Sequence, residues 1–311
     1  MEVMGGIALS EILVTGHTGF IGSQVTAELL KRGYKVCGVS KERLLPPCDN
    51  LRQLNVDLLS ATQCEDFFTK NKFEKMIHLA WFVGTKCHIA NVNMEWLQSS
   101  LVLLNNFYKN GGKVFQCNGT VSEYDFSYGY LTESKTPLEN LSLHGICKSA
   151  LFKVASQFCK QNDMSFKWSR CFNLYGPNEK PQRLMPSVIN SCLNGEDVKV
   201  SDCLKFQDYL HVEDTARGIV DVFESDLEGA VNICSGKPVQ LREIVNKIAE
   251  LTDFKGNILW GAIPAAFGDE VVVGNNEKLR SIGWQPKYTL EEGLKQTINW
   301  WKQHNKEQTN V

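Results

Sequence analysis

Hydrophobic and polar positions follow a regular order over residues 11–40. An apolar run at 12–14 leads into a glycine-rich turn, and the stretch after it places Val25 and Leu29 on one helical face. A second apolar run at 34–39 has the length and composition of another strand. Strand, helix and strand in this order predict a βαβ unit, and such units build parallel sheets.

The same alternation continues along the next part of the chain. Strand-like runs at 75–81, 113–119 and 165–173 alternate with helical patterns at 92–110 and 147–161. Each helical pattern has an apolar stripe along one face. This order predicts an α/β fold with a doubly wound parallel sheet.

The pattern changes in the second half of the chain. Residues 174–186 carry three prolines and are typical of a long loop. Short mixed segments follow, and the final helix opens with a capping box formed by Thr289 and Glu292. We predict a doubly wound domain over residues 1–173 and mainly a smaller α/β lobe over residues 174–311, with some exchange of chain between them.

Composition and charge exclude several classes of protein. Hydrophobic residues make up 43% of the chain and charged residues 22%, which is typical of a globular protein. A formal net charge of −2 gives no field that would attract nucleic acid or acidic membranes. No apolar run is long enough for a membrane span, and the first ten residues lack the features of a secretory signal. We therefore expect a cytoplasmic protein.

The eleven cysteines are an odd number, and no two of them form a CxxC pair. Most lie within apolar runs, as Cys37 and Cys171 do. We expect reduced, buried thiols, which fits a cytoplasmic protein. Cys87 and His88 are adjacent, but no second pair stands at metal-ligand spacing, so we predict no metal site.

The turn after the first predicted strand carries the first chemical signal. Gly16, Gly19 and Gly22 have the spacing GxxGxxG and stand between a strand and a helix. Such glycines let the backbone approach a pyrophosphate, and the helix N-terminus offers free N–H groups. The pattern predicts dinucleotide binding, the alternative being a glycine-rich turn without a ligand. The predicted contacts in this turn are Gly16, Thr18, Gly19, Phe20, Ile21 and Gly22.

The end of the second predicted strand indicates which dinucleotide binds. An acidic residue there would accept hydrogen bonds from the ribose 2′-hydroxyl of NAD. This chain has Ser40, Lys41 and Arg43 instead, and a hydroxyl with two cations favours a 2′-phosphate. We predict NADP(H), with NAD(H) possible and with solvated surface cations as the alternative reading.

Two further segments are candidates for contact with the cofactor. Asp57 and Leu58 follow a third short strand, where an aspartate could accept a hydrogen bond from the adenine amino group. Residues 78–81, His-Leu-Ala-Trp, would line the far side of the cofactor through Leu79, Ala80 and Trp81. We expect His78 itself to be a strand residue whose polar atoms are satisfied inside the core.

Several motifs along nearly the whole chain together resemble one family. They are the GxxGxxG turn, VDLL, HLAW, RCFNLYGP at 170–177, RLMPSVI at 183–189 and DYLHVEDTARGI at 208–219. They resemble the extended short-chain dehydrogenase/reductases, an NAD-dependent epimerase/dehydratase family with a Rossmann fold that includes UDP-galactose 4-epimerase. Residues 261–294 are similar to the CDP-abequose and CDP-paratose synthases, which reduce a 4-keto sugar nucleotide with NADPH.

The resemblance implies three catalytic positions, Thr120, His144 and Lys148. In the family a Ser or Thr orients the carbonyl, a Tyr donates the proton, and a Lys lowers the Tyr pKa and holds the nicotinamide ribose. His144 stands where the Tyr belongs. It could be a replacement acid, a sign of lost catalysis or an ordinary helix-start residue; Tyr128 and Tyr130 are candidates for carrying the proton instead.

The resemblance also implies substrate contacts through Asn173, Arg183, Leu184 and Gln207. Two positions depart from the family pattern. Gln207 stands where relatives often have an arginine, and Ala266 and Phe267 stand where relatives often have another. Losing two hydrogen bonds to a charged diphosphate could weaken binding by about two to four powers of ten. Arg170 and Lys180, with Asn173 and Arg183, could compensate.

These observations favour an NADP(H)-dependent oxidoreductase of sugar-nucleotide metabolism. The simplest reaction is reduction of a 4-keto (deoxy)sugar nucleotide in surface-polysaccharide or glycan sugar biosynthesis. An epimerase or dehydratase with tightly bound cofactor and a catalytically silent dinucleotide-binding partner protein remain alternatives. The helices at 92–110 and 147–161 resemble those that form a dimer interface in the family, so we expect a homodimer.

Overall fold

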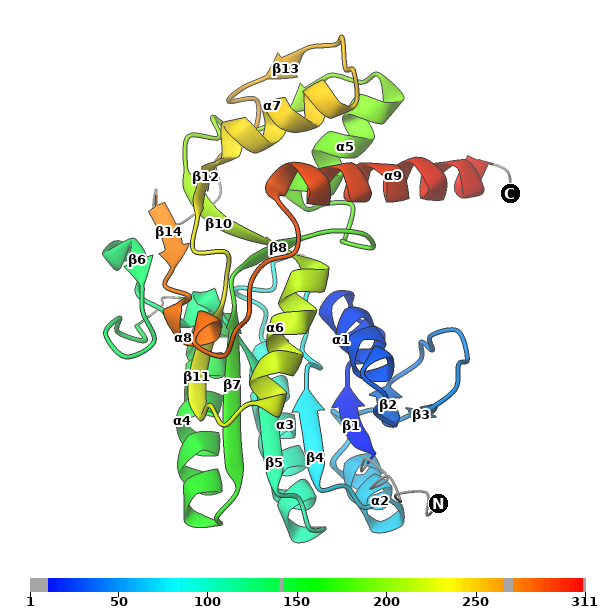
Figure 1. Cartoon of the computed structure of the whole chain (residues 1–311), viewed down its shortest axis with the longest axis vertical. Helices are drawn as coiled ribbons and strands as arrows, with labels where there is room; N and C mark the ends of the chain where they lie inside the picture. The colour runs from blue at the N-terminus through cyan, green and yellow to red at the C-terminus, as the bar shows by residue number, and fades with distance from the viewer. Residues whose placement is uncertain (1–10, 85, 140–141, 266–270, 310–311) are drawn as a thin grey trace, which may run out of the picture. The chain divides into compact units, whose positions relative to one another are not determined.

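The computed structural model describes residues 11–84, 86–139, 142–265 and 271–309. The chain divides into two compact units (Figure 1). The first consists of Met1–Glu123, Glu139–Arg170 and Ile219–Ala230; the second consists of Tyr124–Leu138, Cys171–Gly218 and Val231–Val311. Each unit therefore takes segments from both halves of the sequence.

The first unit is built on a seven-stranded sheet with the order β11-β7-β5-β4-β1-β2-β3. The strands are β1 (Ile12–Thr15), β2 (Val36–Ser40), β3 (Leu51–Asn55), β4 (Lys75–His78), β5 (Val114–Thr120), β7 (Ser165–Cys171) and β11 (Gly229–Ile233). β1 pairs in parallel with both β2 and β4, so the strand order reverses between β1 and β4. The predicted doubly wound sheet is confirmed.

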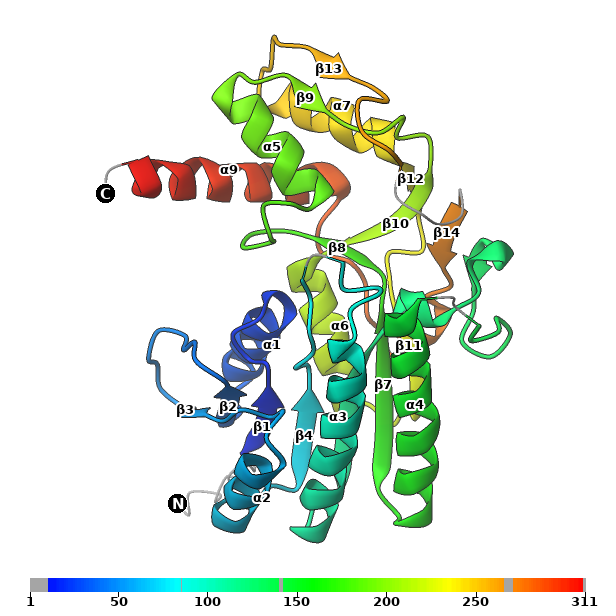
Figure 2. The same ribbon diagram turned by 180° about the vertical axis from the view of Figure 1, so that it is seen from behind.

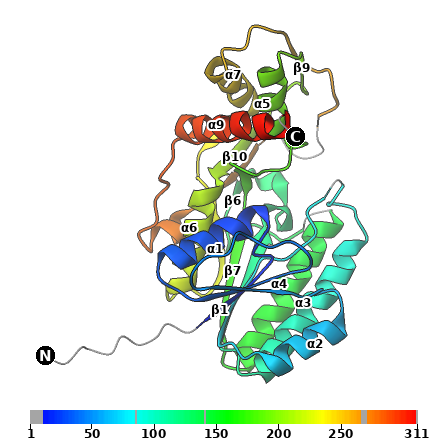
Figure 3. The ribbon, with the colours of Figure 1, turned by 90° about the vertical axis from the view of Figure 1, so that its right-hand side faces the viewer.

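Helices cover both faces of this sheet. They are α1 (Phe20–Lys31), α2 (Ala61–Lys70), α3 (Val92–Lys109) and α4 (Leu143–Gln161). Figure 3 shows α1 on one face and α2, α3 and α4 on the other. The buried side chains of Leu13, Met76, Phe107, Phe115 and Leu151 belong to one core between strands and helices. Leu104 of α3 and Leu151 and Ala155 of α4 pack in this core as the apolar helix stripes predicted, whereas Tyr108 and Val154 of the same stripes are exposed.

The second unit contains a smaller mixed sheet in the order β12-β10-β14-β6, with β8 added beside β10. Its strands are β6 (Tyr130–Leu131), β8 (Asn173–Tyr175), β10 (Phe206–His211), β12 (Pro238–Gln240) and β14 (Val271–Gly274), and β9 (Val198–Lys199) pairs with β13 (Ile258–Leu259). Its helices are α5 (Leu184–Asn194), α7 (Leu241–Leu251), α8 (Glu277–Arg280) and α9 (Leu290–Thr309). Figure 2 shows α5, α7 and α9 gathered together, and they share one core. Helix α6 (Val212–Glu224) contains residues of both units.

Three local predictions have clear outcomes. The capping box is confirmed, because the Glu292 backbone N–H donates to Thr289 Oγ1 at 3.3 Å and the Thr289 N–H donates to Glu292 Oε2 at 2.9 Å. The single strand predicted at 165–173 is wrong, because β7 ends at Cys171 and β8 pairs with β10 in the other sheet. The helix predicted from residue 147 begins at Leu143, so His144 lies in its first turn.

Neither a membrane-spanning helix nor a metal-binding cluster occurs in the part of the chain that the structure describes. No helix there is long and apolar enough to cross a membrane. No three side chains of the metal-binding types come together within the described ranges. All eleven cysteines are free thiols, and only Cys48 and Cys87 are not buried. The predicted burial of most cysteines is confirmed.

Candidate cofactor and active site

The glycine-rich turn lies where the strand order of the sheet reverses. Doubly wound sheets bind ligands at this point, beyond the carboxyl ends of the strands. Gly16 follows β1 with φ of +70°, a conformation that L side chains rarely adopt. A Cβ atom on Gly16 would lie 2.8 Å from the Cα of Ala80, which follows β4. Only glycine lets these two loops approach so closely.

The start of α1 has the form of an anion site. Gly19 caps the helix without a side-chain hydrogen bond, and it is exposed. A Cβ on Gly22 would lie 2.0 Å from the Gly16 carbonyl oxygen, so the first helical turn packs directly on the glycine turn. The backbone N–H groups at the N-terminus of this 12-residue helix receive no hydrogen bond from a capping side chain, and such groups favour a phosphate. The turn therefore fits the pyrophosphate of a dinucleotide. Of the remaining predicted contacts in the turn, Thr18 is buried and Phe20 and Ile21 are partly buried.

His17 connects the turn to the loop that follows β2, which was not foreseen from the sequence. Its fully buried ring packs on Gly38, where a Cβ would lie 2.4 Å from the ring. Nε2 of His17 lies 2.9 Å from Oε1 of Gln53 on β3. The Gln53 side chain also accepts from the N–H of Leu45 at 2.8 Å and donates to its carbonyl at 3.0 Å. The loop between β2 and β3 is thus tied to the glycine turn.

The residues predicted to select NADP(H) stand at the end of β2, which is Ser40, and at the start of this loop. The Ser40 hydroxyl donates to the Arg43 carbonyl, and the Arg43 side chain is exposed. Lys41 Nζ lies 2.9 Å from Asp57 Oδ2. This hydrogen bond raises the pKa of Lys41 and lowers the pKa of Asp57. Asp57, which we expected to contact the adenine, therefore forms an ion pair with Lys41 in this structure.

The other predicted cofactor contacts lie along the same edge of the sheet. The Leu58 carbonyl accepts from the Ser99 hydroxyl. Leu79 is partly buried, and its N–H donates to the Thr15 carbonyl at 3.1 Å. His78 is buried with Nδ1 2.7 Å from Thr15 Oγ1, and Nε2 lies 2.9 Å from the hydroxyl of Ser100. The expectation that His78 is a satisfied core residue is confirmed.

Thr120 and Lys148 are both connected to strand β5. Thr120 is the last residue of that strand, and its hydroxyl oxygen accepts from the Ser122 N–H at 3.2 Å. Lys148 is buried on α4 and donates from Nζ to the Asn118 carbonyl at 2.7 Å. The same Nζ lies 3.8 Å from the centroid of the Trp81 ring, a cation–π distance. The lysine is therefore held beside both the strand end and the loop after β4.

His144 lies one helical turn before Lys148 and is almost fully buried. Its ring meets the Trp81 ring edge to face with centroids 6.1 Å apart. Nδ1 of His144 lies 3.1 Å from Oδ1 of Asn93, near the start of α3. Burial and, to a smaller extent, the charges of Lys148 and His88 lower the pKa of His144 to about 3. The imidazole is therefore neutral at physiological pH.

Arg170 belongs to a buried network, so the suggestion that it could hold a substrate diphosphate is wrong. Its Nε lies 2.7 Å from Glu123 Oε2, and both side chains are buried. Glu123 also accepts from the Thr120 N–H at 2.8 Å and from Trp168 Nε1 at 3.0 Å. The network connects β7 to the end of β5, which carries Thr120. Its role in the first unit is structural.

The predicted substrate residues lie in the second unit. Asn173 on β8 donates from Nδ2 to Gln207 Oε1 on β10 at 3.0 Å. Arg183 precedes α5 with an exposed side chain whose Nε lies 3.8 Å from Oε1 of Glu179. Glu179 is buried, which raises its pKa to about 8, and no pattern in the sequence indicated it. Leu184 opens α5 and packs on the core.

The remaining candidate positions are exposed or lie outside the described residues. Tyr128 and Tyr130, the alternative proton donors, are exposed residues of the second unit. Lys180 is exposed as well. Ala266 and Phe267 lie outside the described residues.

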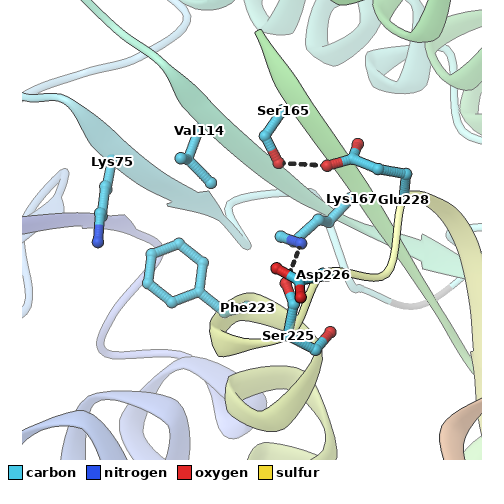
Figure 4. Close-up of a pocket in the computed structure, with 8 residues that line it drawn as sticks. All are labelled: Lys75, Val114, Ser165, Lys167, Phe223, Ser225, Asp226 and Glu228. Atoms are coloured by element: carbon cyan, nitrogen blue, oxygen red, sulfur yellow. Dashed lines mark hydrogen bonds between the residues drawn. The ribbon is translucent and has the colours of Figure 1, made fainter. Parts of the chain in front are cut away.

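A pocket of about 300 Å³ lies in the first unit among the starts of β4, β5 and β7 (Figure 4). Its polar groups bond to one another, since the Ser165 hydroxyl donates to Glu228 Oε1 at 2.6 Å and Lys167 Nζ to the Ser225 carbonyl at 2.7 Å. It lies at the amino ends of the strands. Because doubly wound sheets bind cofactors at the carboxyl ends, this pocket is not the cofactor site.

Known proteins resemble this chain over nearly its whole length. It is 27% identical to GDP-L-fucose synthase 1 of Arabidopsis thaliana over 94% of the chain and 93% of that protein. It is 21% identical to CDP-abequose synthase of Salmonella muenchen over 93% of the chain and 97% of that protein. The structure of UDP-glucose 4-epimerase of Thermotoga maritima with UDP-glucose matches with a TM-score of 0.85 and 25% identity, over 95% of this chain and 99% of that one.

A family model matches more than half of the chain as well. The matched residues, 12–234, include the glycine turn, Thr120, His144 and Lys148. The chain belongs to the NAD dependent epimerase/dehydratase family.

Proposed function

We propose that the protein is an NADP(H)-dependent oxidoreductase acting on a nucleotide sugar, most simply by reducing a 4-keto (deoxy)sugar nucleotide. The glycine turn between β1 and α1, at the point where the strand order reverses, is the observation that carries this proposal. The reductase reading draws on the likeness to CDP-abequose synthase and on the motifs of residues 261–294. A role in surface-polysaccharide or glycan sugar biosynthesis and a cytoplasmic location belong to the same proposal.

Different residues would bind the cofactor and the nucleotide sugar. Gly16, Gly19 and the N–H groups at the start of α1 would hold the pyrophosphate. When bound, the nicotinamide supplies the hydride. Lys148, held by the Asn118 carbonyl, would bind the nicotinamide ribose, and Thr120 would orient the sugar carbonyl. In the second unit, Asn173, Arg183, Leu184 and Gln207 would contact the nucleotide sugar.

The NADP(H) preference rests on the end of β2. Ser40 replaces the carboxylate that would repel a 2′-phosphate, and Lys41 and Arg43 are exposed cations beside it. The ion pair between Lys41 and Asp57 is solvent-exposed, and such pairs contribute little. A 2′-phosphate with its stronger charge would therefore compete for Lys41.

Replacing either cation should weaken NADPH binding selectively. A hydrogen bond to a charged group contributes about 1.5–3 kcal/mol, so Lys41→Ala and Arg43→Ala should each weaken NADPH binding about tenfold or more. NADH affinity should change little, because NADH has no 2′-phosphate. Fluorescence titration with both reduced nucleotides measures the ratio. Lys35→Ala removes an exposed cation just before the other end of β2 and is the control. Clearly tighter NADH binding by the unaltered protein would contradict the preference.

We also propose that the protein is a homodimer, because two of its helices resemble those that form a dimer interface in the family. Helices α3 and α4 pack side by side (Figure 2). Their outer faces expose Met94 and Tyr108 on α3, and Ile146 and Val154 on α4. Exposed apolar stripes on two adjacent helices are typical of a face that a second copy covers.

A charge on this face should separate the two copies. Val154 is 49% exposed, and Val154→Glu would bury an unpaired carboxylate in the interface. Size-exclusion chromatography with light scattering should give a dimer for the unaltered chain and a monomer for this variant. Val271→Glu, at a 42% exposed valine of the second unit, should stay dimeric. A monomeric unaltered protein would contradict the proposal.

The neutral His144 favours a second candidate, a catalytically silent dinucleotide-binding protein. Its lowered pKa means that no ready proton donor stands in the tyrosine position. A silent protein would bind NADPH and turn over no 4-keto sugar nucleotide, whereas the reductase would consume NADPH. A non-redox epimerase or dehydratase would instead retain its cofactor during purification and turn over without net NADPH consumption. Assays of NADPH consumption and of bound nucleotide separate the three.

A further inference from the structure

The side-chain amide of Asn93 has a unique orientation. Its Nδ2 lies 2.7 Å from the carbonyl oxygen of Cys87 and 2.8 Å from that of Ala90. Carbonyl oxygens only accept hydrogen bonds, so this atom must be the NH₂ group. The opposite atom, Oδ1, lies 2.9 Å from Nε1 of Trp81, which only donates. Exchanging the oxygen and nitrogen would break all three hydrogen bonds.

This orientation determines where the proton of His144 resides. Nδ1 of His144 lies 3.1 Å from the same Oδ1 atom of Asn93. Because an amide oxygen cannot donate, Nδ1 must carry the hydrogen. In a neutral imidazole only one nitrogen carries a hydrogen, so Nε2 is left with a lone pair. Nε2 makes no hydrogen bond within the described residues.

The protonated imidazolium, which would donate from both nitrogens, is disfavoured by its surroundings. His144 is buried between Trp81 and the loop before α3. The ionisable groups whose charge acts on His144 are Lys148 on its own helix and His88 in that loop. The ring centroids of His88 and His144 lie 6.1 Å apart. The backbone N–H of His144 donates to the His88 carbonyl at 3.2 Å, which keeps the loop against the helix. No carboxylate is among the groups that shift the His144 pKa.

We propose that His144 is held by Asn93 as the Nδ1–H tautomer and accepts, at Nε2, a hydrogen bond from a hydroxyl group of the substrate. It is then a positioning group that recognises an alcohol, and it is not the proton donor that a tyrosine would be. A ketone oxygen has no hydrogen to offer Nε2, so this contact favours the alcohol form over the keto form. Asn93 is the positioning residue behind it. The hydroxyl-bearing ligand rests on the proposed function; the tautomer does not.

Nuclear magnetic resonance of the full chain with ¹⁵N-labelled histidine tests the tautomer directly. Long-range ¹H–¹⁵N correlation spectra distinguish a protonated from an unprotonated ring nitrogen, and His144→Gln identifies the signal. We expect protonated Nδ1 and unprotonated Nε2 for His144 at every pH from 8 to 5. A protonated Nε2 at neutral pH would overturn the proposal.

Two variants of Asn93 separate a specific role from general packing. Asn93→Asp keeps an acceptor facing Nδ1, so the tautomer should persist and the imidazolium should appear at higher pH. Asn93→Leu removes the acceptor, so a substantial fraction of Nε2–H should appear. Asn106→Leu is the matched control, since Asn106 lies farther along α3 and its Nδ2 donates to the Val102 carbonyl. An unchanged tautomer in Asn93→Leu would show that Asn93 does not set it.

The ligand is tested by adding UDP-glucose, CDP-glucose, dTDP-glucose and GDP-mannose with NADP⁺ to the labelled protein. A nucleotide sugar that binds should shift Nε2 of His144 in the direction of hydrogen-bond acceptance and leave Nδ1 protonated. Binding without any effect on Nε2 would overturn the hydroxyl contact. Failure of all four to bind would count against the proposed substrate class and the hydroxyl contact, while the tautomer result would still stand.

Discussion

Gly16→Ala is expected to lower NADPH affinity by about 100-fold or more, which corresponds to about 2.7 kcal/mol. Gly16 has φ of +70°, and forcing an L residue into this region costs about 1–2 kcal/mol. The added Cβ would also lie 2.8 Å from the backbone of Ala80, so the turn must move away from β4. This movement displaces the N–H groups that face the pyrophosphate. Fluorescence titration with NADPH measures the loss.

Gly33→Ala separates backbone strain from damage to the site. Gly33 follows the other end of α1 with φ of +85°, and a Cβ there would meet no atom within 4 Å. This variant should lose a similar amount of stability from strain and bind NADPH as the unaltered protein does. If both variants bound NADPH equally well, the glycine turn would not be the cofactor site.

Arg170→Met is expected to lower the free energy of unfolding by about 3–5 kcal/mol, because breaking a buried ion pair leaves an uncompensated charge. Glu123 would keep its hydrogen bonds from the Thr120 N–H and Trp168 Nε1 and would lose the only guanidinium that the described residues place against it. Urea unfolding followed by circular dichroism measures the change.

Arg52→Met is the matched control for this substitution. Arg52 pairs with Glu11 at 2.7 Å, but both side chains are substantially solvent-accessible. Exposed pairs contribute about 0–1 kcal/mol, so this variant should unfold almost as the unaltered protein does. Adding Glu123→Gln to Arg170→Met should recover part of the lost stability. Equal losses in the two single variants would show that the buried pair has no special role.

The parts of the fold that depend on nearby residues could be predicted from the sequence. The glycine turn, the flanking strand and helix, and the capping box of Thr289 and Glu292 each lie within a short segment. The burial of His78 followed from the apolar run around it. The doubly wound class of the sheet follows from the alternation of strands and helices, since right-handed crossovers leave few arrangements.

Contacts between distant segments could not be predicted in this way. Arg170 stood in a motif that resembles a ligand site, yet its partner is Glu123, 47 residues away. The run at 165–173 ends in a second strand, β8, which pairs with β10 in the other sheet. No local sequence pattern indicates this pairing. Asn93 is a polar residue in an otherwise ordinary helix start. Its role becomes clear only from its contact with His144, which lies 51 residues later in the chain.

The histidine in the tyrosine position raises the question of whether this chain has a proton donor there. The sequence offered His144 as a replacement acid, a lost function or a helix-start residue. The structure adds that its Nδ1 is bonded to Asn93 and that its pKa is lowered to about 3. A proton-donating role is therefore disfavoured, and hydrogen-bond acceptance is the role that the geometry supports. Thr120 ends β5 and Lys148 donates to the Asn118 carbonyl on the same strand, and their catalytic roles belong to the proposed function.

Calorimetric titration of the purified protein, freed of any carried nucleotide, tests the central claim most directly. We predict that NADPH binds at one site per chain, and more tightly than NADH. Absence of measurable binding by either reduced nucleotide would contradict a dinucleotide site at the glycine turn.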